Sequence, residues 1–189
     1  IDPHHHLIDR PESGTYLLPD LLADIASGHN IVATVYLEWL SMYRKDGPPV
    51  MRPVGEIEFA NGVAAMAASG GYGKTLVCAG IVGHGELTLG AGLRKVLEAM
   101  IVAGGGAGGR FKGVRFIASS DPDQGKWGAT AVRPADLLRN GKVREGFAQL
   151  APLGLSFDAW VYHPQLPDLV DLARAFPQTD RKSTRLNSS

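Results

Sequence analysis

The chain has 189 residues, and its 19 Lys and Arg balance its 19 Asp and Glu, so the formal net charge is zero. This balance gives no support for a basic nucleic-acid groove, and 44% hydrophobic residues argue against long disorder. The lone Cys78 excludes an internal disulfide and a cysteine-rich zinc site. No apolar run reaches the ~18 residues of a membrane helix, and no signal peptide is visible. We therefore expect a cytoplasmic protein without membrane or nucleic-acid partners.

Strand and helix patterns alternate along the chain. Apolar, often β-branched runs predict strands over residues 1–9, 31–37, 76–82, 111–117 and 155–161. Apolar residues at helical spacing predict helices over residues 17–26, 56–69, 89–103, 134–140 with 142–150, and 166–176. Five such units in sequence require parallel strands with crossover helices. This order fits a doubly wound open sheet or an eightfold barrel, and periodicity does not choose between them.

Two glycine motifs match phosphate-binding patterns but lie in the wrong context. They are the Gly-x-Gly-x-x-Gly run at residues 104–109 and the Gly-Lys-Thr run at residues 73–75. Both patterns need a strand before them and a helix after them, so that a helix N-terminus meets the phosphates. Here a predicted helix comes first, and Ala68 occupies a glycine position of the P-loop. We predict helix-to-strand connections without nucleotide, so the open sheet loses its main support.

The first predicted strand carries histidines two positions apart. Because side chains alternate along a strand, His4 and His6 share one face and His5 points to the other. Two neutral imidazoles on one face can share a divalent metal ion. The alternative is a tag or a surface run of histidines, although a tag would be longer and would not lie between apolar strand residues. The residues alone leave both interpretations open.

The stretch Asp2-x-His4-x-His6-Leu7 with Asp9 resembles the first-strand signature of the amidohydrolase superfamily. The resemblance is to its amidohydrolase 2 branch of predicted metal-dependent TIM-barrel hydrolases, which includes pyrone-dicarboxylate lactonases, sugar lactonases and related decarboxylases. Further segments resemble this branch in the same order, at residues 35–38, 62–66, 78–83, 111–115 and 157–167. The resemblance implies an α/β fold, a (β/α)8 TIM barrel truncated to about its first five βα units.

The resemblance also implies that His4 and His6 are metal ligands, with zinc expected first and manganese as the alternative. Active-site groups of barrels stand at the carboxyl ends of the strands. At these ends we expect Glu38 and His84 to bind substrate. The alternative for Glu38 is a structural hydrogen-bond partner, and the alternative for His84 is an ordinary loop residue.

Two candidates follow from the later strands. Arg115 is expected to bind substrate, because its planar fork holds a carboxylate bidentately. His163 is expected to be catalytic, as a metal ligand or a substrate contact. Related sequences often carry a histidine directly after this arginine, and here that position is Phe116.

Two loops carry weaker candidates. Tyr43 and Arg44 follow the second predicted strand and are candidates for specificity. Trp127, after the fourth strand, could cover the site, although a local packing role is the simpler interpretation.

The function implied is metal-dependent hydrolysis of a small carbonyl compound, with a lactone favoured. In this superfamily a divalent metal activates water, and a carboxylate or histidine takes its proton. The usual strand-six histidine and strand-eight aspartate do not occur in this chain. The alternatives are a decarboxylase of the same superfamily and a non-catalytic barrel. The expected partner is a small-molecule substrate, and a homo-oligomer of the full-length protein is left open.

The last ten residues differ from the rest. A common short-read sequencing adapter, GAT CGG AAG AGC ACA CGT CTG AAC TCC AGT, translates to residues 180–189. We expect residues 1–179 to be a partial amidohydrolase-type barrel and residues 180–189 to be non-native, with no strand pattern. Resequencing of the locus tests this. Because five strands cannot close an eight-strand barrel, we expect the chain alone to be inactive.

Overall fold

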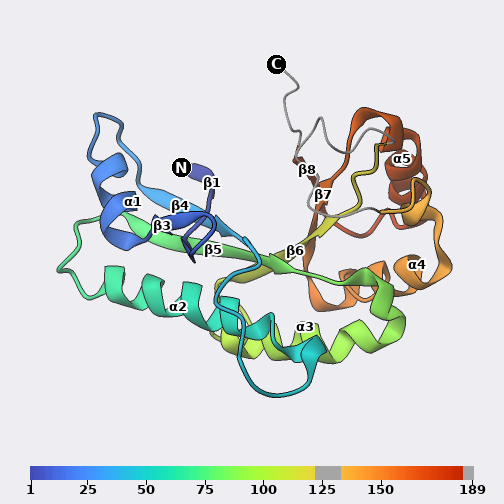
Figure 1. The fold of residues 1–189 in the computed structure, drawn as a ribbon, viewed down its shortest axis with the longest axis horizontal. Helices are drawn as coiled ribbons and strands as arrows, with labels where there is room; N and C mark the ends of the chain where they lie inside the picture. The colour runs from blue at the N-terminus through green and yellow to red at the C-terminus, as the bar shows by residue number, and fades with distance from the viewer. Residues whose placement is uncertain (122–132, 185–189) are drawn as a thin grey trace. The chain divides into compact units, whose positions relative to one another are not determined.

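The computed structural model describes residues 1–121 and 133–184. Its parallel strands are β1 (Asp2–His5), β4 (Ala33–Leu37), β5 (Leu76–His84), β6 (Phe111–Ile117), β7 (Ser156–Trp160) and β8 (Arg181–Thr184). Its α-helices are α1 (Leu18–Ile25), α2 (Val54–Ala68), α3 (Leu93–Ala103), α4 (Gly141–Phe147) and α5 (Leu166–Ala175) (Figure 1). The strands are ordered β1-β4-β5-β6-β7-β8, and the pairs β1–β4, β4–β5, β6–β7 and β7–β8 are parallel. The predicted alternation of strands and helices is confirmed.

The chain divides into two compact units. The first unit comprises Ile1–His84 with Val96–Lys112, and the second comprises Gly85–Lys95 with Gly113–Ser189. In the described residues, no helix combines the length and the apolar character that crossing a membrane requires.

In the first unit, helix α2 runs along β5 (Figure 1). Its side chains Ile57, Ala60 and Ala64 are buried together with Val77 and Ile81 of β5. Small alanine side chains let the helix approach the strand closely, while the isoleucines supply most of the apolar area removed from water. This packing positions the beginning of α2, where the chain passes close to the end of β4.

In the second unit, helix α4 packs against the 3-10 segment η2 (Leu87–Gly92). The two helical pieces predicted on either side of Gly141 are present as η4 (Leu137–Arg139) and α4, but the break between them lies at Asn140 and not at Gly141. Asn140 caps the helix by accepting hydrogen bonds from Lys142 N at 2.8 Å and Val143 N at 3.4 Å, so α4 begins at Gly141. At its other end the ring of Phe147 lies 4.9 Å from that of Phe157 on β7. The cap and the aromatic pair together anchor α4 to this unit.

Two glycines of α4 provide a matched test of this packing. A Cβ on Gly146 would lie 2.3 Å from the Leu87 carbonyl oxygen, whereas nothing lies within 4 Å of a Cβ on Gly141. We expect Gly146→Ala to lower the free energy of unfolding by about 1 to 3 kcal/mol, because the backbone must move. Gly141→Ala should be neutral or stabilising by up to about 1 kcal/mol. Urea unfolding measures both values, and equal stability of the two variants would contradict the packing.

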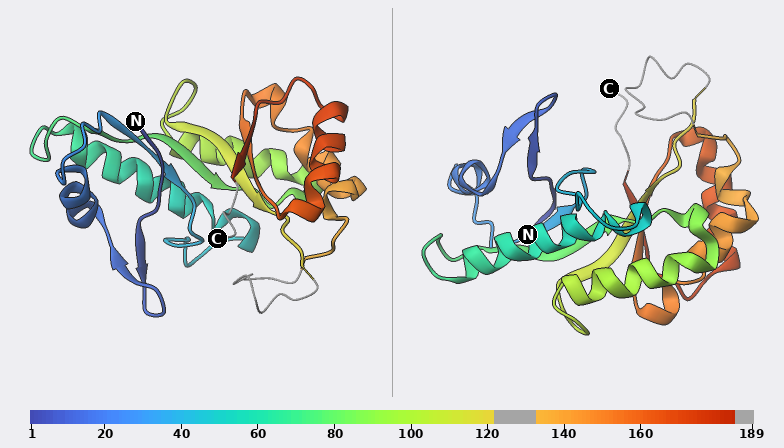
Figure 2. Two further views of the ribbon diagram at one scale, coloured as in Figure 1. Left: turned by 90° about the horizontal axis from the view of Figure 1, so that it is seen from above. Right: turned by 60° about the horizontal axis from the view of Figure 1, so that its bottom comes forward.

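Two predicted elements differ most from the structure in their bounds. The strand predicted over residues 1–9 ends at His5, and Ile8–Arg10 instead forms the hairpin strand β2 with β3 (Gly14–Tyr16), beside α1 (Figure 2). Gly14 has φ of 79°, a turn conformation that glycine adopts without steric cost. The helix predicted over residues 89–103 begins only at Leu93, because Gly90 has φ of 58° and interrupts the helical path.

Strand β8 was not predicted. Residues 181–184 pair in parallel with β7, with Phe157 opposite Arg181 and Trp160 opposite Thr184. The amide of Phe157 also donates to the Asp180 carbonyl at 2.9 Å. Backbone groups at the edge of a strand bond to any extended segment, so pairing does not require an apolar pattern.

Candidate functional site

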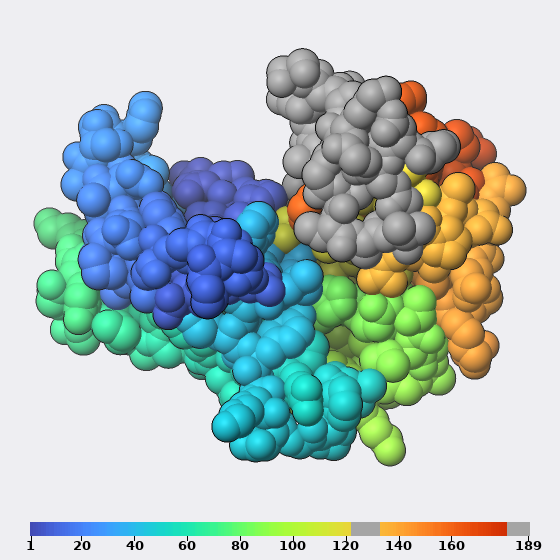
Figure 3. All heavy atoms as spheres, viewed as in Figure 1, coloured from blue at the N-terminus to red at the C-terminus, as the bar shows by residue number. Residues whose placement is uncertain are grey.

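His4 on β1 and His6, the residue directly after β1, point at each other. His4 Nε2 and His6 Nε2 lie 3.2 Å apart, with the ring centroids 4.9 Å apart and the rings nearly perpendicular. His4 is exposed and His6 is half-buried, and in Figure 3 the N-terminal residues, coloured dark blue, lie on the surface shown. The predicted shared face of His4 and His6 is therefore present.

This separation suits a shared metal ion. Zinc–nitrogen bonds of about 2.0 to 2.1 Å at a tetrahedral angle place two ligand nitrogens about 3.3 to 3.4 Å apart. His6 Nδ1 lies 2.9 Å from the Leu37 carbonyl oxygen. Because a carbonyl only accepts, Nδ1 carries the proton, and the unprotonated nitrogen of His6 is Nε2, which faces His4. Among the described residues, no group of three or more His, Cys, Asp or Glu is placed to hold a metal ion.

His5 points to the opposite face, as predicted. Its side chain is buried, with Nε2 3.7 Å from Cys78 Sγ and its ring 5.8 Å from the Tyr36 ring. Burial lowers the pKa of His5 and raises the pKa of Cys78 to about 12. A neutral imidazole beside a protonated thiol is a core contact, so His5 plays no part in the His4–His6 pair.

A carboxylate that the sequence did not single out is connected to His6 through Trp39, whose amide it binds and whose ring contacts the His6 ring. Glu56, in the first turn of α2, is fully buried, and its Oε1 accepts from Tyr36 Oη at 2.9 Å and from Trp39 N at 2.8 Å. Burial, with a further contribution from the charge of Glu38, raises the pKa of Glu56 to about 7. An acidic residue in a first helical turn is ordinary, so only the tertiary contacts distinguish Glu56.

Glu38 and His84 lie at strand ends in the first unit, as predicted. Glu38 directly follows β4, is fully buried, and accepts from Leu40 N at 3.2 Å through Oε2. His84 is the half-buried last residue of β5. The hydrogen bond from Leu40 N fits the alternative prediction for Glu38, that of a structural hydrogen-bond partner. Substrate binding by Glu38 or His84 stays a prediction.

Arg115 and His163 belong to the second unit. Arg115 on β6 is 2% exposed, and its guanidinium lies 4.7 Å from the centre of the Trp160 ring. Its register partner on β7 is Asp158, which is also buried. His163 is exposed at the start of η6 (His163–Gln165). Their expected roles as substrate clamp and catalytic residue also stay predictions.

The η6 turn contains a buried residue that the sequence did not single out. Gln165 accepts from Tyr162 N at 3.1 Å and Ser120 N at 3.2 Å, and donates to the Ser120 carbonyl at 2.7 Å. This amide connects the segment after β6 to the segment after β7. An isolated glutamine in a loop carries no sequence signal for such a role.

The remaining candidates are placed as follows. Arg44 is exposed and forms an ion pair with Glu58, while Tyr43 is half-buried. Phe116, which stands where related sequences often have a histidine, is fully buried. Trp127 lies outside the described residues.

A cavity of about 360 Å³ borders the histidine pair, between β1, the β2–β3 hairpin and α1. Its polar walls include Asp2 and Asp24, and Tyr16 Oη donates to Asp24 Oδ2 at 2.6 Å. Among the residues that the structure describes, no lysine or arginine lines it. The cavity can therefore hydrogen-bond neutral polar groups but is unfavourable for an anion.

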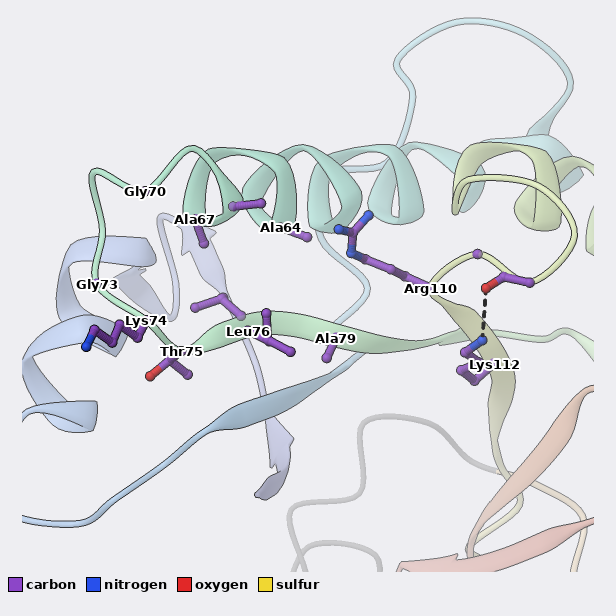
Figure 4. A pocket seen from close by; sticks show the side chains of 14 residues that line it. Ala64, Ala67, Gly70, Gly73, Lys74, Thr75, Leu76, Ala79, Arg110 and Lys112 are labelled. Carbon is purple, nitrogen blue, oxygen red and sulfur yellow. Dashed lines mark hydrogen bonds between the residues drawn. The ribbon is translucent and has the colours of Figure 1, made fainter.

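A second cavity, of about 490 Å³, shares none of these lining residues. It lies between α2 and the beginnings of β5 and β6, over alanine side chains (Figure 4). Figure 4 shows Lys74 at one end, Arg110 pointing to α2, and Lys112 directed to the Gly108 carbonyl. Because these cations do not converge, their charges do not form an anion site.

No family model matches the chain. The chain is 29% identical to the uncharacterized protein y4mH of Sinorhizobium fredii (strain NBRC 101917 / NGR234) over an alignment of 198 residues. The alignment covers 94% of this chain and 58% of that protein. The chain thus spans somewhat more than half of this relative's length.

Two solved structures are similar to the chain, both of an amidohydrolase from Burkholderia multivorans. The form with bound zinc matches with a TM-score of 0.62 and 17% identity, over 96% of this chain and 56% of that one. The form with bound HEPES matches with a TM-score of 0.57 and 17% identity, over 94% and 53%. The likeness confirms the predicted fold class, an α/β chain of parallel strands and helices that forms part of a TIM barrel. The chain has an amidohydrolase-like fold over slightly more than half of that enzyme's length.

Proposed function

We propose that this chain contributes the first metal ligands of a metal-dependent hydrolase that acts on a small carbonyl compound, with a lactone favoured. The observation that carries the proposal is the 3.2 Å approach of His4 Nε2 and His6 Nε2, together with the tautomer fixed by Leu37. The amidohydrolase-like fold supports it, and the similar structure from Burkholderia multivorans holds zinc. Zinc is the preferred ion, with manganese as the alternative.

When bound, a divalent cation polarises a carbonyl and lowers the pKa of a water molecule. His4 and His6 would hold that ion through Nε2. The acidic walls of the adjoining cavity, Asp2 and Asp24 with the Tyr16 hydroxyl, would accept hydrogen bonds from substrate hydroxyl groups. This favours a neutral, hydroxylated ring over a carboxylated one in that cavity.

In the second unit, we propose that Arg115 interacts with a substrate oxygen and that His163 exchanges a proton with substrate or water. A cation–π contact with the Trp160 ring restrains the Arg115 guanidinium, while exposure of His163 leaves its ring accessible to solvent. Glu38 and His84 are proposed to contact substrate beside the histidine pair.

The test uses the complete protein encoded by the gene. After dialysis we expect close to one zinc ion per chain, by elemental analysis, and zinc-dependent opening of at least one lactone in a panel of neutral and carboxylated substrates. Chelator-treated protein and a His4→Ala variant serve as controls. Carbon dioxide release without ring opening would favour the decarboxylase, and absence of both bound metal and turnover would reject an enzymatic role.

A further inference from the structure

One carboxylate oxygen connects the segment that follows β4 to helix α2. Oε1 of Glu56 accepts three hydrogen bonds, from Tyr36 Oη at 2.9 Å, Trp39 N at 2.8 Å and Ser41 N at 3.2 Å. Glu56 is fully buried, and its Oε2 has no hydrogen-bond partner among the described residues. These contacts join helix α2 to both ends of the short segment 39–41.

The held segment has an unfavourable backbone conformation. Leu40 and Met42 both have φ of 56°, in the left-handed region that residues with a side chain rarely adopt. The chain also passes tightly over the beginning of α2, since a Cβ on Gly55 would lie 2.6 Å from both the Met42 carbonyl oxygen and the Arg44 amide nitrogen. Such a path persists only where the surroundings hold it, and the three Glu56 hydrogen bonds contribute to this together with those from Leu40 N to Glu38 and from Ser41 Oγ to Leu7.

This segment in turn contacts His6. The Trp39 ring lies 4.6 Å from the His6 ring, tilted by 43°. Ser41 Oγ donates to the Leu7 carbonyl at 3.4 Å, directly after His6 in the chain. Just before the segment, the Leu37 carbonyl accepts a hydrogen bond from His6 Nδ1. The residues on either side of Glu38 therefore set both the tautomer and the tilt of the His6 imidazole.

We propose that Glu56 is a positioning residue for the metal pair: by accepting hydrogen bonds from the Trp39 and Ser41 amides it keeps Trp39 against His6, and so presents His6 Nε2 towards His4. The inference rests on the proposed metal pair for its functional meaning. It assigns to Glu56 no contact with substrate or metal.

The test compares three variants of the 189-residue chain. Glu56→Ala removes the acceptor, Glu56→Gln keeps one acceptor oxygen without the charge, and Glu58→Ala is the matched control. Glu58 lies on the same helix and pairs with the exposed Arg44 of the same loop. Zinc affinity is measured by competition with a chromophoric chelator. Nuclear Overhauser contacts between the Trp39 and His6 rings are measured without metal.

Loss of a hydrogen bond that orients a ligand typically weakens metal binding by roughly 10- to 100-fold, and we expect this loss for Glu56→Ala, with disappearance of the Trp39–His6 contact. Glu56→Gln should retain both, because an amide oxygen accepts the same donors, and Glu58→Ala should equal the wild type. If Glu56→Ala does not fold, Glu56→Asp replaces it. The shorter side chain keeps the carboxylate but is too short to accept the hydrogen bonds from Trp39 N and Ser41 N.

The inference is overturned if Glu56→Ala keeps wild-type zinc affinity and the Trp39–His6 contact, or if Glu56→Gln fails like Glu56→Ala. A wild-type chain that binds no zinc would count against the proposed function instead. The ring contact then decides the role of Glu56, since its loss in Glu56→Ala supports positioning and its persistence refutes it.

Discussion

Replacing His6 with alanine is expected to weaken zinc binding by the 189-residue chain by more than about 100-fold, because outer-shell contacts alone are worth about 10- to 100-fold. The variant removes one of two imidazole nitrogens that lie 3.2 Å apart. A single remaining histidine binds zinc through one nitrogen and loses the chelate. Isothermal titration with zinc on metal-free protein measures the affinity, and His4→Ala should show a loss of similar size.

The control for this experiment is His29→Ala. His29 is exposed and does not line the cavity beside the pair. Its removal should leave zinc affinity unchanged, which separates a specific chelate from general binding by surface histidines. Unaltered zinc affinity in His6→Ala would show that the paired imidazoles are not the metal site.

The stability of the chain is expected to depend on pH through Glu56. Its pKa is about 7 in the folded chain, against 4.5 for an unperturbed glutamate, mainly because of burial. Between these pH values the folded state retains a proton that the unfolded state releases. The free energy of unfolding therefore falls as pH rises from 4.5 to about 7, by an amount on the order of 3 kcal/mol, and this contribution is constant above pH 7.

The measurement is urea unfolding at pH 5 and pH 8, for the wild type and for Glu56→Gln. The variant does not titrate at this position. The decrease in its free energy of unfolding from pH 5 to pH 8 should therefore be smaller than the decrease in the wild type, by about 3 kcal/mol. Glu58→Gln is the control. The hydrogen bond from Arg44 lowers the pKa of Glu58 below 4.5, so the contribution of this exposed carboxylate is already present at pH 5, and its removal should leave the change between pH 5 and pH 8 the same as in the wild type. Parallel pH profiles of wild type and Glu56→Gln would disprove the assignment.

The histidine pair could be predicted because its geometry is local. Side-chain direction in a strand alternates with period two, and this rule placed His4 and His6 together and His5 apart without knowledge of the fold. The same rule extended the strand too far. The separate pairing of Ile8–Arg10 with Gly14–Tyr16 depends on a turn at Gly14, and a strand pattern alone does not show where a chain changes partner.

Glu56 could not be predicted because its partners are distant in sequence. Its hydrogen bonds reach residues 15 to 20 positions earlier in the chain, and they exist only because α2 packs along β5. Arg115 shows the same limit. Its position on a strand was evident from the pattern, but its burial beside Trp160 depends on the register between β6 and β7.

The pairing of β8 with β7 has a consequence for handling the protein. Four polar residues, Arg181 to Thr184, add to the sheet through parallel backbone pairing, so the edge of β7 selects an extended conformation rather than a particular side-chain pattern. A synthetic extended peptide supplied in trans would compete with residues 181–184 for these backbone groups. A shortened chain without these residues would leave the backbone N–H and C=O groups at the edge of β7 unpaired. Separate copies of the chain would then pair through these edges and aggregate.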